Sequence, residues 1–523
     1  MTAKQARSTE FGSRFVLRRR SPPLPRRSRR TSLARTIGRQ SPREDDMDQS
    51  VNSASVNAMQ DVFHRAIALS REGAPATAKE RLDRLARLRA LVVENELAFD
   101  KAISADFGNR SSTETLIAET LFVLAEIKHA TKHLNRWMAA KHVATELQYF
   151  PAKNRLLPQP LGVVGIIAPW NYPLQLTLAP AIAAIAAGNR VLIKPSELVP
   201  QFSALLKKLI AEKFDDAELY VTGIDGDISQ KFASLPFDHL IFTGSTRVGR
   251  MVAEAAGRNL TPVTLELGGK SPTIVDRSAD ISEAAERIVY GKLMNAGQTC
   301  IAPDYVLIPK ASMDEFVSKA SANIAKMFGT SPDNKDYTSI VSDNHYARLE
   351  AVLADAAAQG AKITQAAKPS DPAWKSKRKF PPTIVSGVTP DMKIMQEEIF
   401  GPILPVSACE TASEAISYIN AHDRPLALYW FGKDDAARDE VLARTVSGGV
   451  TVNDCLFHFV QANQPMGGVG ASGIGAYHGE WGFNTLSKMK PIFYRSPFNR
   501  LADLYPPYGG KIARLIKLLR FMS

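Results

Sequence analysis

The order of apolar and polar positions divides the chain into stretches of different character. Residues 1–50 show no apolar period and are rich in Arg, Ser and Pro. From about Val56 to Val143 apolar residues recur with helical spacing, which predicts helices over Ala78–Glu96 and Thr113–Met138. Beyond Gln148, short apolar runs typical of buried strands begin to alternate with helical segments.

The alternating part of the chain predicts parallel sheets. We expect strands at Leu161–Ala168, Arg190–Lys194, His239–Thr243 and Pro272–Asp276, and helices at Leu174–Ala187 and Arg247–Gly257. Strands that alternate with helices form open α/β structures, because a helix must cross over between parallel strands. A second series of the same kind runs from Ala284 to about Asn453, so a second α/β region is expected. No internal repeat of 20–50 residues is present.

Composition places the chain among soluble globular proteins. It has 523 residues, of which 45% are hydrophobic and 23% charged, and this length favours two or three domains. The richest apolar run, Leu174–Ala187, contains Gln175, Thr177 and Pro180, so a buried helix is a better interpretation than a membrane span. The three cysteines lack CxxC spacing, which indicates a reduced compartment and argues against a disulfide scaffold or a metal site. We therefore expect a cytoplasmic protein without a bound metal.

The net charge of +12 is concentrated at the N-terminus. Residues 1–46 hold thirteen Lys and Arg against four acids, so most of the excess charge belongs to this segment and the rest of the chain is nearly balanced. Three interpretations of the segment are open: an organelle transit peptide, a basic arm for nucleic acid, or an upstream extension with Met47 as the true start. Each predicts a disordered extension, and the body carries no sign of a nucleic-acid partner.

Two residues are candidates for catalysis. Cys300 stands in the polar turn Asn295–Ala302, and a thiolate there would be a strong nucleophile towards a carbonyl carbon. Glu266 lies between leucines, where apolar surroundings can poise a carboxylate as a general base near neutral pH. The alternatives are a structural cysteine and a glutamate that reaches water at a strand end.

Two further motifs suit a nucleotide. Gly244-Ser-Thr-Arg-Val-Gly249 follows a predicted strand and opens a helix, where glycines let the backbone approach a pyrophosphate. Lys194-Pro-Ser-Glu197 follows another strand, where a Lys and an acid could hold ribose hydroxyls. Each motif alone is equally compatible with an ordinary turn or a solvated strand end.

The last thirteen residues predict an amphipathic helix. In Lys511–Ser523 the apolar residues Ile512, Leu515, Ile516 and Leu519 share one face, while Lys511, Arg514, Lys517 and Arg520 cover the rest. Such a helix can lie on an anionic membrane surface or pack on its own protein. The second alternative is favoured, because the segment is too short to span a bilayer.

Taken together, the motifs resemble the aldehyde dehydrogenase superfamily from roughly Ala58 to Phe498. The matching segments stand in the family's order: Ala168-Pro-Trp-Asn-Tyr-Pro173, Lys194-Pro-Ser-Glu197, Phe242-Thr-Gly-Ser-Thr-Arg-Val-Gly249, Leu265-Glu-Leu-Gly-Gly-Lys270, Gly297-Gln-Thr-Cys300, Gln396-Glu-Glu-Ile-Phe-Gly-Pro402 and Pro465-Met-Gly-Gly-Val-Gly-Ala-Ser-Gly473. Seven such matches make a chance resemblance negligible.

The resemblance implies roles for single residues. For catalysis it implies Cys300 as nucleophile, Asn171 with the Cys300 backbone N–H as oxyanion hole, and Glu266 as the base that activates water. For the cofactor it implies Lys194 and Glu197 at the adenosine ribose, Gly244, Ser245 and Gly249 at the pyrophosphate, Glu398 at the nicotinamide ribose, Phe400 at the nicotinamide, and Pro169 and Trp170 along the cofactor site. Tyr172 matches a substrate-tunnel aromatic. The implied cofactor is NAD, with NADP as an alternative.

The resemblance also implies the domain organisation of an α/β protein. A Rossmann-like cofactor domain is expected over 47–263, with an arm hairpin near 146–160, and an α/β catalytic domain over 264–453. The chain would return to the cofactor domain over 454–487. Residues 488–523 would supply the strand of a small oligomerisation arm and the C-terminal helix, and a homodimer is expected.

Weaker cues concern the substrate. Gly475-Ala-Tyr-His-Gly479 is similar to the branch of fatty, aromatic and coniferyl aldehyde dehydrogenases, and His133-Leu-Asn-Arg-Trp-Met138 favours the bacterial coniferyl type. Phe457, His458 and Phe459 either line a substrate tunnel or serve as packing aromatics. A long-chain fatty aldehyde dehydrogenase is the alternative. An inactive structural or binding paralogue is disfavoured by the intact Cys300, Glu266 and Asn171.

Overall fold

The computed structural model describes residues 44–225, 227–366, 370–498, 505–508 and 510–522. The chain divides into the units Met1–Asp48 and Gln49–Ser523. The predicted disordered extension lies outside the described residues, except for residues 44–46, which form the first turn of helix α1 (Glu44–Glu72). Disorder was therefore the wrong prediction for these three residues.

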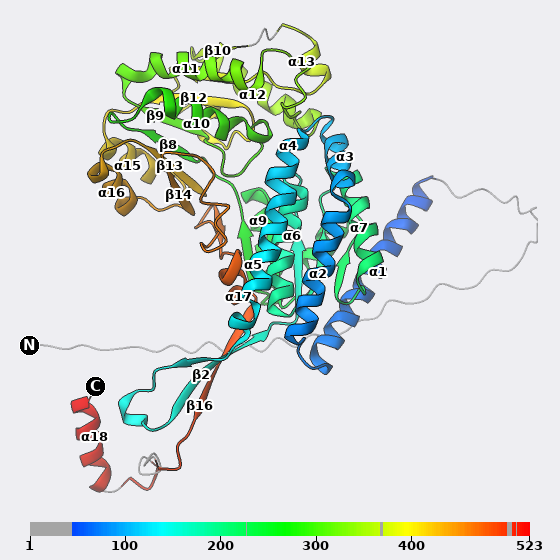
Figure 1. The fold of residues 1–523 in the computed structure, drawn as a ribbon, viewed down its shortest axis with the longest axis vertical. Helices are drawn as coiled ribbons and strands as arrows, with labels where there is room; N and C mark the ends of the chain where they lie inside the picture. The colour runs from blue at the N-terminus through cyan, green and yellow to red at the C-terminus, as the bar shows by residue number, and fades with distance from the viewer. Residues whose placement is uncertain (1–43, 226, 367–369, 499–504, 509, 523) are drawn as a thin grey trace, which may run out of the picture. The chain divides into compact units, whose positions relative to one another are not determined.

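A six-stranded sheet forms the first half of the second unit (Figure 1), in the order β15-β7-β6-β3-β4-β5. Its parallel strands are β3 (Val163–Ile167), β4 (Arg190–Lys194), β5 (Leu219–Val221), β6 (His239–Thr243) and β7 (Val263–Glu266), and β15 (Gly473–Ile474) runs antiparallel to β7. The strands predicted at 161–168, 190–194 and 239–243 are confirmed. Because β7 belongs to this sheet, the chain changes sheets after Glu266, and the boundary predicted at residue 264 was placed too early.

Alternate residues of these strands pack under different helices. Val164 and Ile166 face a layer made of α2 (Ala78–Glu94), α3 (Glu96–Phe107), α5 (Leu121–Met138), α6 (Pro173–Ala187) and α7 (Pro200–Lys213). Val163 and Ile167 face α1, α8 (Ile228–Ala233) and α9 (Thr246–Gly257). Both faces of the sheet are thus buried, which explains why its strands are continuous apolar runs.

A seven-stranded sheet forms the second half, in the order β10-β11-β12-β9-β8-β13-β14. Neighbouring strands of this sheet are parallel, except the antiparallel pair of β10 and β11. The strands are β8 (Pro272–Val275), β9 (Tyr305–Ile308), β10 (Lys362–Gln365), β11 (Thr383–Ser386), β12 (Ile403–Ala408), β13 (Ala427–Phe431) and β14 (Gly449–Val452). The accompanying helices are α10 (Ile281–Leu293), η3 (Met294–Gly297), α11 (Lys310–Phe328), α12 (Asp343–Ala358), α13 (Ala373–Ser376), α14 (Lys393–Gln396), α15 (Ala412–Asn420) and α16 (Asp435–Arg444).

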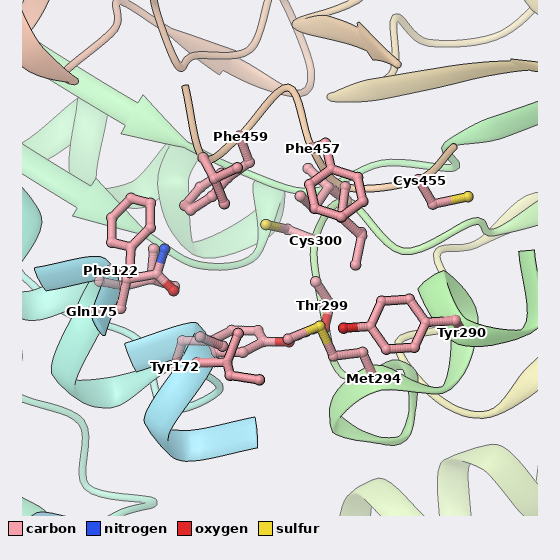
Figure 2. Close-up of a pocket in the computed structure, with 16 residues that line it drawn as sticks. Phe122, Tyr172, Gln175, Tyr290, Met294, Thr299, Cys300, Cys455, Phe457 and Phe459 are labelled. Atoms are coloured by element: carbon pink, nitrogen blue, oxygen red, sulfur yellow. The ribbon is translucent and has the colours of Figure 1, made fainter. Parts of the chain in front are cut away.

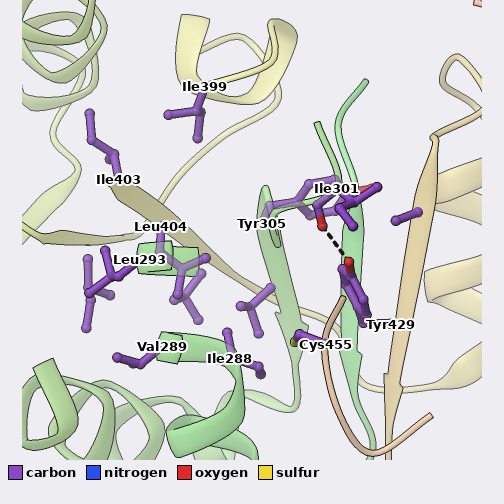
Figure 3. Close-up of a cluster of buried hydrophobic side chains, with 14 of the residues drawn as sticks. Ile288, Val289, Leu293, Ile301, Tyr305, Ile399, Ile403, Leu404, Tyr429 and Cys455 are labelled. Atoms are coloured by element: carbon purple, nitrogen blue, oxygen red, sulfur yellow. Dashed lines mark hydrogen bonds between the residues drawn. The ribbon is translucent and has the colours of Figure 1, made fainter. Parts of the chain in front are cut away.

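The core of this second sheet reaches the residue after Cys300. Figure 3 shows the buried Tyr429 of β13 with its hydroxyl donating to the backbone carbonyl of Ile301. Ile301 itself is buried in the same cluster as Tyr305 of β9 and Ile288 of α10. The segment that follows Cys300 is therefore attached to a close-packed core.

A three-stranded antiparallel sheet forms the arm (Figure 1). Its strands are β1 (Lys141–Val143), β2 (Lys153–Pro160) and β16 (Ser487–Tyr494), with β2 in the middle. The first strand lies before the predicted hairpin range of 146–160. Within that range, residues 147–149 form the 3-10 turn η2 (Leu147–Tyr149) rather than a strand. The arm thus begins at Lys141.

The remaining helices refine the predicted pattern. The helix predicted over 113–138 is divided into α4 (Ser112–Thr115), the π-helical η1 (Leu116–Thr120) and α5. Helix α17 (Gly479–Thr485) precedes β16, and α18 (Gly510–Met522) confirms that the C-terminal segment is helical. None of the helices in the described part of the chain combines the length and the apolarity that a membrane span requires.

Candidate active site

Cys300 follows a turn with an unusual backbone. Asn295, Ala296 and Gly297 have φ angles of 52°, 51° and 75°, in the left-handed region that most residues avoid. A Cβ on Gly297 would lie 2.4 Å from the carbonyl oxygen of Gly401, so only glycine allows this close approach of two backbones. The Cys300 turn is therefore fixed against the loop that contains Glu398 and Phe400.

Gln298 anchors the same turn. Its side chain is fully buried, with Nε2 donating to the carbonyls of Asn295 (3.0 Å) and Ser339 (3.1 Å) and Oε1 accepting from the N–H of Val341 (3.0 Å). Each of these bonds is made inside the protein, where polar groups need partners. The residue that stands two places before Cys300 thus has little freedom to move.

Asn171 lies beside this turn, at the start of α6. Its side-chain Nδ2 donates to the carbonyl of Gln298 over 3.1 Å, and its own carbonyl accepts from Nδ2 of Asn295 over 2.9 Å. Asn171 is 4% exposed. The structure therefore brings Asn171 and the backbone around Cys300 together, as an oxyanion hole would require.

Glu266 ends strand β7 and is buried. Neither carboxylate oxygen has a hydrogen-bond partner, although the residue is only 4% exposed. Burial without a partner raises the pKa of Glu266 well above its usual value. Among the described residues, no basic side chain forms an ion pair with it, so desolvation alone prepares this carboxyl to bind a proton.

The thiol of Cys300 is affected by the same surroundings. Burial raises its pKa to about 12, and the negative charges of Glu398 and Glu266 add to the effect. Both carboxylates therefore lie close enough to the sulfur for their charges to affect its pKa.

An apolar cavity opens beside the sulfur (Figure 2). In that view Cys300 points towards the side on which Phe122 and Phe459 lie. The cavity is lined by Ile117, Ala118, Phe122, Tyr172, Gln175, Leu176, Tyr290, Met294, Thr299, Cys300, Ile301, Cys455, Leu456, Phe457, Phe459 and Val460. We call this the Cys300 cavity.

The predicted aromatic residues differ in their positions. Tyr172 lines the Cys300 cavity, and its hydroxyl forms a 2.8 Å hydrogen bond with Oγ1 of Thr299. Phe457 and Phe459 also line the cavity. His458 does not: it is half-buried on the other side of the segment, where Nδ1 pairs with Oγ1 of Thr451 over 2.8 Å. For His458, packing is the correct alternative.

The residues expected to hold a nucleotide lie at the carboxyl ends of β3, β4 and β6. The buried Lys194 forms a 2.5 Å ion pair with Glu197, whose side chain is 61% exposed. Ser245 caps α9, with its hydroxyl accepting from the N–H of Val248, and Gly244 directly follows β6. A Cβ on Gly249 would lie 2.6 Å from a methyl group of Leu267, so glycine allows α9 to approach closely.

The second part of this region surrounds Glu398. A Cβ on Gly268 would lie 2.1 Å from Oε2 of Glu398, and burial raises the pKa of Glu398 to about 8. Its Oε1 has no hydrogen-bond partner. This glycine cradle and orphaned oxygen fit a ligand hydroxyl, and the conformation of Phe400, with φ of 50°, is one that a functional loop can retain.

The tryptophan and proline after β3 border the same region. The half-buried Trp170 meets the ring of Phe400 edge-on, with centroids 5.5 Å apart, and also contacts His345 at 5.0 Å. Pro169 is buried directly after β3. The residues expected around a dinucleotide thus lie at the carboxyl ends of strands of the six-stranded sheet, except Glu398 and Phe400, which come from the loop before β12 of the other sheet.

Sequence reasoning missed several lining and supporting residues. Phe122 and Ile117 come from the region that was predicted only to be helical, and Ile117 is 51% exposed there. Arg110 and Glu119, both buried, contact the start of α6. An apolar residue on the solvent side of a helix was the one signal that could have indicated the cavity.

Comparison with known proteins identifies relatives of this arrangement. Residues 30–492 match the family described as the aldehyde dehydrogenase family. The chain is 46% identical, over 88% of its length and 96% of the relative's, to a protein of Caulobacter vibrioides named "Probable coniferyl aldehyde dehydrogenase".

Two solved structures show the same fold. The substrate-bound AldH of Staphylococcus aureus has a TM-score of 0.83 at 38% identity, covering 88% of this chain and 99% of its own. An aldehyde dehydrogenase of Mycobacterium tuberculosis complexed with NAD+ has a TM-score of 0.75 at 26% identity, covering 85% and 90%. The predicted α/β fold, with a Rossmann-like and a catalytic part, is confirmed by these neighbours.

Proposed function

The chain belongs to the aldehyde dehydrogenase family, and we propose that it oxidises an aromatic aldehyde of the coniferyl type to the carboxylic acid through a thioester on Cys300. It is an NAD(P)-dependent oxidoreductase. The observation that carries the proposal is that Cys300 lines an aromatic cavity, while the Asn171 amide donates to the carbonyl of Gln298, two residues before Cys300.

Each protein group has a defined task in the first half of this reaction. The Cys300 sulfur attacks the aldehyde carbon as the thiolate and forms a thiohemiacetal, whose oxyanion accepts hydrogen bonds from Nδ2 of Asn171 and the Cys300 N–H. NAD(P), when bound, accepts the hydride from this carbon. Lys194, Glu197, Ser245 and Glu398 would hold it, since the glycine cradle and the unpaired oxygen beside Glu398 fit a ribose hydroxyl.

The second half of the reaction requires a base. The thioester carbonyl remains in the oxyanion hole while Glu266 takes a proton from a water molecule, which then attacks and releases the acid. The raised pKa of Glu266 suits this task, because a carboxyl with so little stabilisation of its charge is a stronger base than an exposed one. Coenzyme-A-acylating relatives generally lack this glutamate, so water is the proposed acceptor.

The walls of the Cys300 cavity support an aromatic substrate. Phe122, Phe457 and Phe459 offer ring faces and edges that stack on a planar cinnamyl group. Gln175 is 4% exposed and lines the same cavity, and it offers an amide to a phenolic or methoxy oxygen. The name of the Caulobacter relative supports the same substrate. A long-chain fatty aldehyde is the second candidate, because the cavity is otherwise apolar.

A panel of aldehydes tests the proposal. NADH formation would be measured with coniferyl, cinnamyl, benzyl and C6 to C16 alkyl aldehydes, with Cys300→Ala as the blank. We expect kcat/KM to be highest for the cinnamyl group and at least tenfold lower for alkyl aldehydes. A maximum at long alkyl chains would replace the aromatic assignment by the fatty one, and turnover by Cys300→Ala would remove Cys300 from the mechanism.

A homodimer in the cytoplasm is part of the same proposal. The arm sheet supports a dimer, because β16 leaves one of its edges without a partner strand among the described residues. Three free cysteines, Cys300, Cys409 and Cys455, support a reducing compartment. Analytical ultracentrifugation would test the dimer, and a monomer at micromolar concentration would contradict it.

A further inference from the structure

Two charged residues outside the Cys300 cavity form a fully buried ion pair. Arg110, which follows α3, places its Nη1 atom 2.8 Å from Oε1 of Glu119, and neither side chain is exposed to solvent. Glu119 comes from the π-helical segment η1. Neither residue lines the cavity.

Both members of this pair are connected to the start of α6. The same Nη1 of Arg110 donates to the backbone carbonyl of Asn171 over 3.0 Å. The other oxygen of Glu119, Oε2, accepts from the backbone N–H groups of Leu174 (2.6 Å) and Gln175 (3.1 Å), which are otherwise unpaired at a helix N-terminus. The pair therefore contacts the chain immediately before and after Tyr172.

The contacts define the position of Asn171 from several sides. Its carbonyl accepts from Arg110 and from Nδ2 of Asn295, and its side-chain amide donates to Gln298. The Arg110 guanidinium also lies over the ring of Tyr172, 4.8 Å from its centroid. Removing Arg110 would leave the Asn171 backbone attached on one side only.

Stability alone is a poor explanation for this arrangement. Desolvation of two buried charges offsets much of their attraction, and well-packed apolar residues in their place often give equal or greater stability. Nε and Nη2 of Arg110 are buried without hydrogen-bond partners, which increases this cost. Because this pair is costly to bury and is bonded to the segment that contains Asn171, positioning of that segment explains the pair better than stability does.

We propose that Arg110 and Glu119 are positioning residues that hold the Asn171 amide at the place where the oxyanion forms. The proposal rests on the role proposed above for Asn171. It predicts that Arg110 affects the chemical step only through Asn171, since a displacement of about 1 Å of a positioned group can reduce a rate by roughly 10²-fold.

A double-mutant cycle tests this coupling. The single-turnover rate of hydride transfer would be measured for the wild-type chain, Arg110→Met, Asn171→Ala and the double variant. We expect Arg110→Met to lower the rate between about 10- and 100-fold in the wild-type background and less than threefold in the Asn171→Ala background. Equal factors in both backgrounds would overturn the positioning role.

Two more measurements distinguish the failure of this inference from other failures. If Asn171→Ala retains the full rate, the proposed role of Asn171 itself fails. If Arg110→Met does not fold, Arg110→Lys and Glu119→Gln are measured in its place. We expect Arg110→Lys to keep part of the wild-type single-turnover rate, because the lysine can still reach Glu119. A full wild-type rate in both Arg110→Lys and Glu119→Gln would contradict the inference.

A matched control separates positioning from a general loss of stability. Arg84 of α2 forms a largely buried ion pair, 3.1 Å long, with Glu218, which directly precedes β5. We expect Arg84→Met to lower the melting temperature without changing the single-turnover rate, and Arg110→Met to keep the affinity for NAD+ unchanged. Equal losses of hydride-transfer rate in both variants would show that Arg110 acts through stability alone.

Discussion

At the residue scale, Cys300 has a chemical environment that opposes its proposed role. The sulfur must be ionised to attack, yet burial and the charges of Glu398 and Glu266 raise its pKa to about 12. The same carboxyls are themselves buried and have raised pKa values. Without a bound cofactor, the site therefore holds its nucleophile mainly as the thiol.

This environment predicts the pH dependence of Cys300 alkylation. A group whose pKa is raised to about 12 is almost fully protonated at neutral pH, so its thiolate fraction grows about tenfold with each pH unit. The rate of iodoacetamide labelling, measured by mass spectrometry without NAD(P), should rise about tenfold from pH 7 to 8 and again from pH 8 to 9. Cys300→Ala corrects for Cys409 and Cys455, and a plateau below pH 9 would contradict the expectation.

Glu266 carries a second prediction at this scale. Glu266→Gln should allow one hydride transfer per site and then stop at the thioester, because an amide cannot take a proton from water. Stopped-flow absorbance would show a burst near one equivalent of NADH and a steady state lower by about 10²- to 10⁴-fold. Glu126→Gln is the control, since burial also raises the pKa of Glu126, to about 7, and Glu126 lies in α5, outside the segments that carry Cys300 and Glu266. A full steady state in Glu266→Gln would assign the base to another group.

At the element scale, the edge of the six-stranded sheet sets the cofactor preference. Glu197 follows β4 and stays mostly exposed, while the buried Lys194 is already paired with it. The charge of Glu197 would repel a 2′-phosphate, so we expect higher kcat/KM with NAD than with NADP. NADP should still be accepted, because Lys194 offers a compensating positive charge.

The variant Glu197→Gln tests this explanation. It removes the repulsion and frees the charge of Lys194, so the ratio of kcat/KM for NAD to that for NADP should fall about fivefold, as expected for roughly 1 kcal/mol between partly exposed charges. Glu212→Gln in α7 is the control, because Glu212 is similarly exposed but is paired only with its helical neighbour Lys208. An unchanged ratio in Glu197→Gln would remove Glu197 from cofactor selection.

The elements also show which features of the site could be predicted from the sequence. Strands such as Arg190–Lys194 and His239–Thr243 were predicted to the residue, because a strand buried on both faces is a continuous apolar run between polar turns. The π-helical turn at Leu116–Thr120 was not, since it adds a residue to a helix without changing its composition. That turn contains Glu119, whose burial no helical periodicity indicates.

Polar contacts between distant segments limited the prediction of the site in the same way. Cys300, Asn171 and Glu266 were predicted through motifs, and the Asn171 amide contacts the turn that leads to Cys300. The helical periodicity gives no role to Arg110 and Glu119, and only the fold shows that both are buried and bonded to the start of α6. A sequence pattern records the polarity of a residue but not the partner that makes burial tolerable.

At the scale of the whole molecule, the cores of the two large sheets share a buried cluster beside Cys300. Tyr172 and Leu176 of the first helical layer belong to the same buried cluster as Ile301 and Tyr429 of the seven-stranded sheet. Glu266 ends the last parallel strand of one sheet, and the chain enters the other directly afterwards. The site therefore depends on the packing of both halves, and a change far from it can act through that packing.

A truncation at the N-terminus tests whether this packing depends on the basic extension. A chain that starts at Met47 lacks thirteen of the basic residues and loses most of the excess positive charge. It keeps Met59, Phe63 and Ala66 of α1, which are buried against Phe237, Leu240 and their neighbours on one face of the six-stranded sheet. We expect this chain to have unchanged kcat, KM and melting temperature, and to bind heparin much more weakly at low salt.

A second truncation shows where the fold begins. A chain that starts at Glu72 also loses the three buried side chains of α1, of which Met59 and Phe63 each contribute about 2 kcal/mol of burial free energy. Its melting temperature should fall by at least 5 °C, since a loss of several kcal/mol shifts the melting temperature of a large domain by several degrees. Differential scanning fluorimetry and steady-state kinetics on both chains give the comparison. If the chain starting at Met47 loses stability as well, residues before it take part in folding; if neither chain does, the contacts of α1 contribute little.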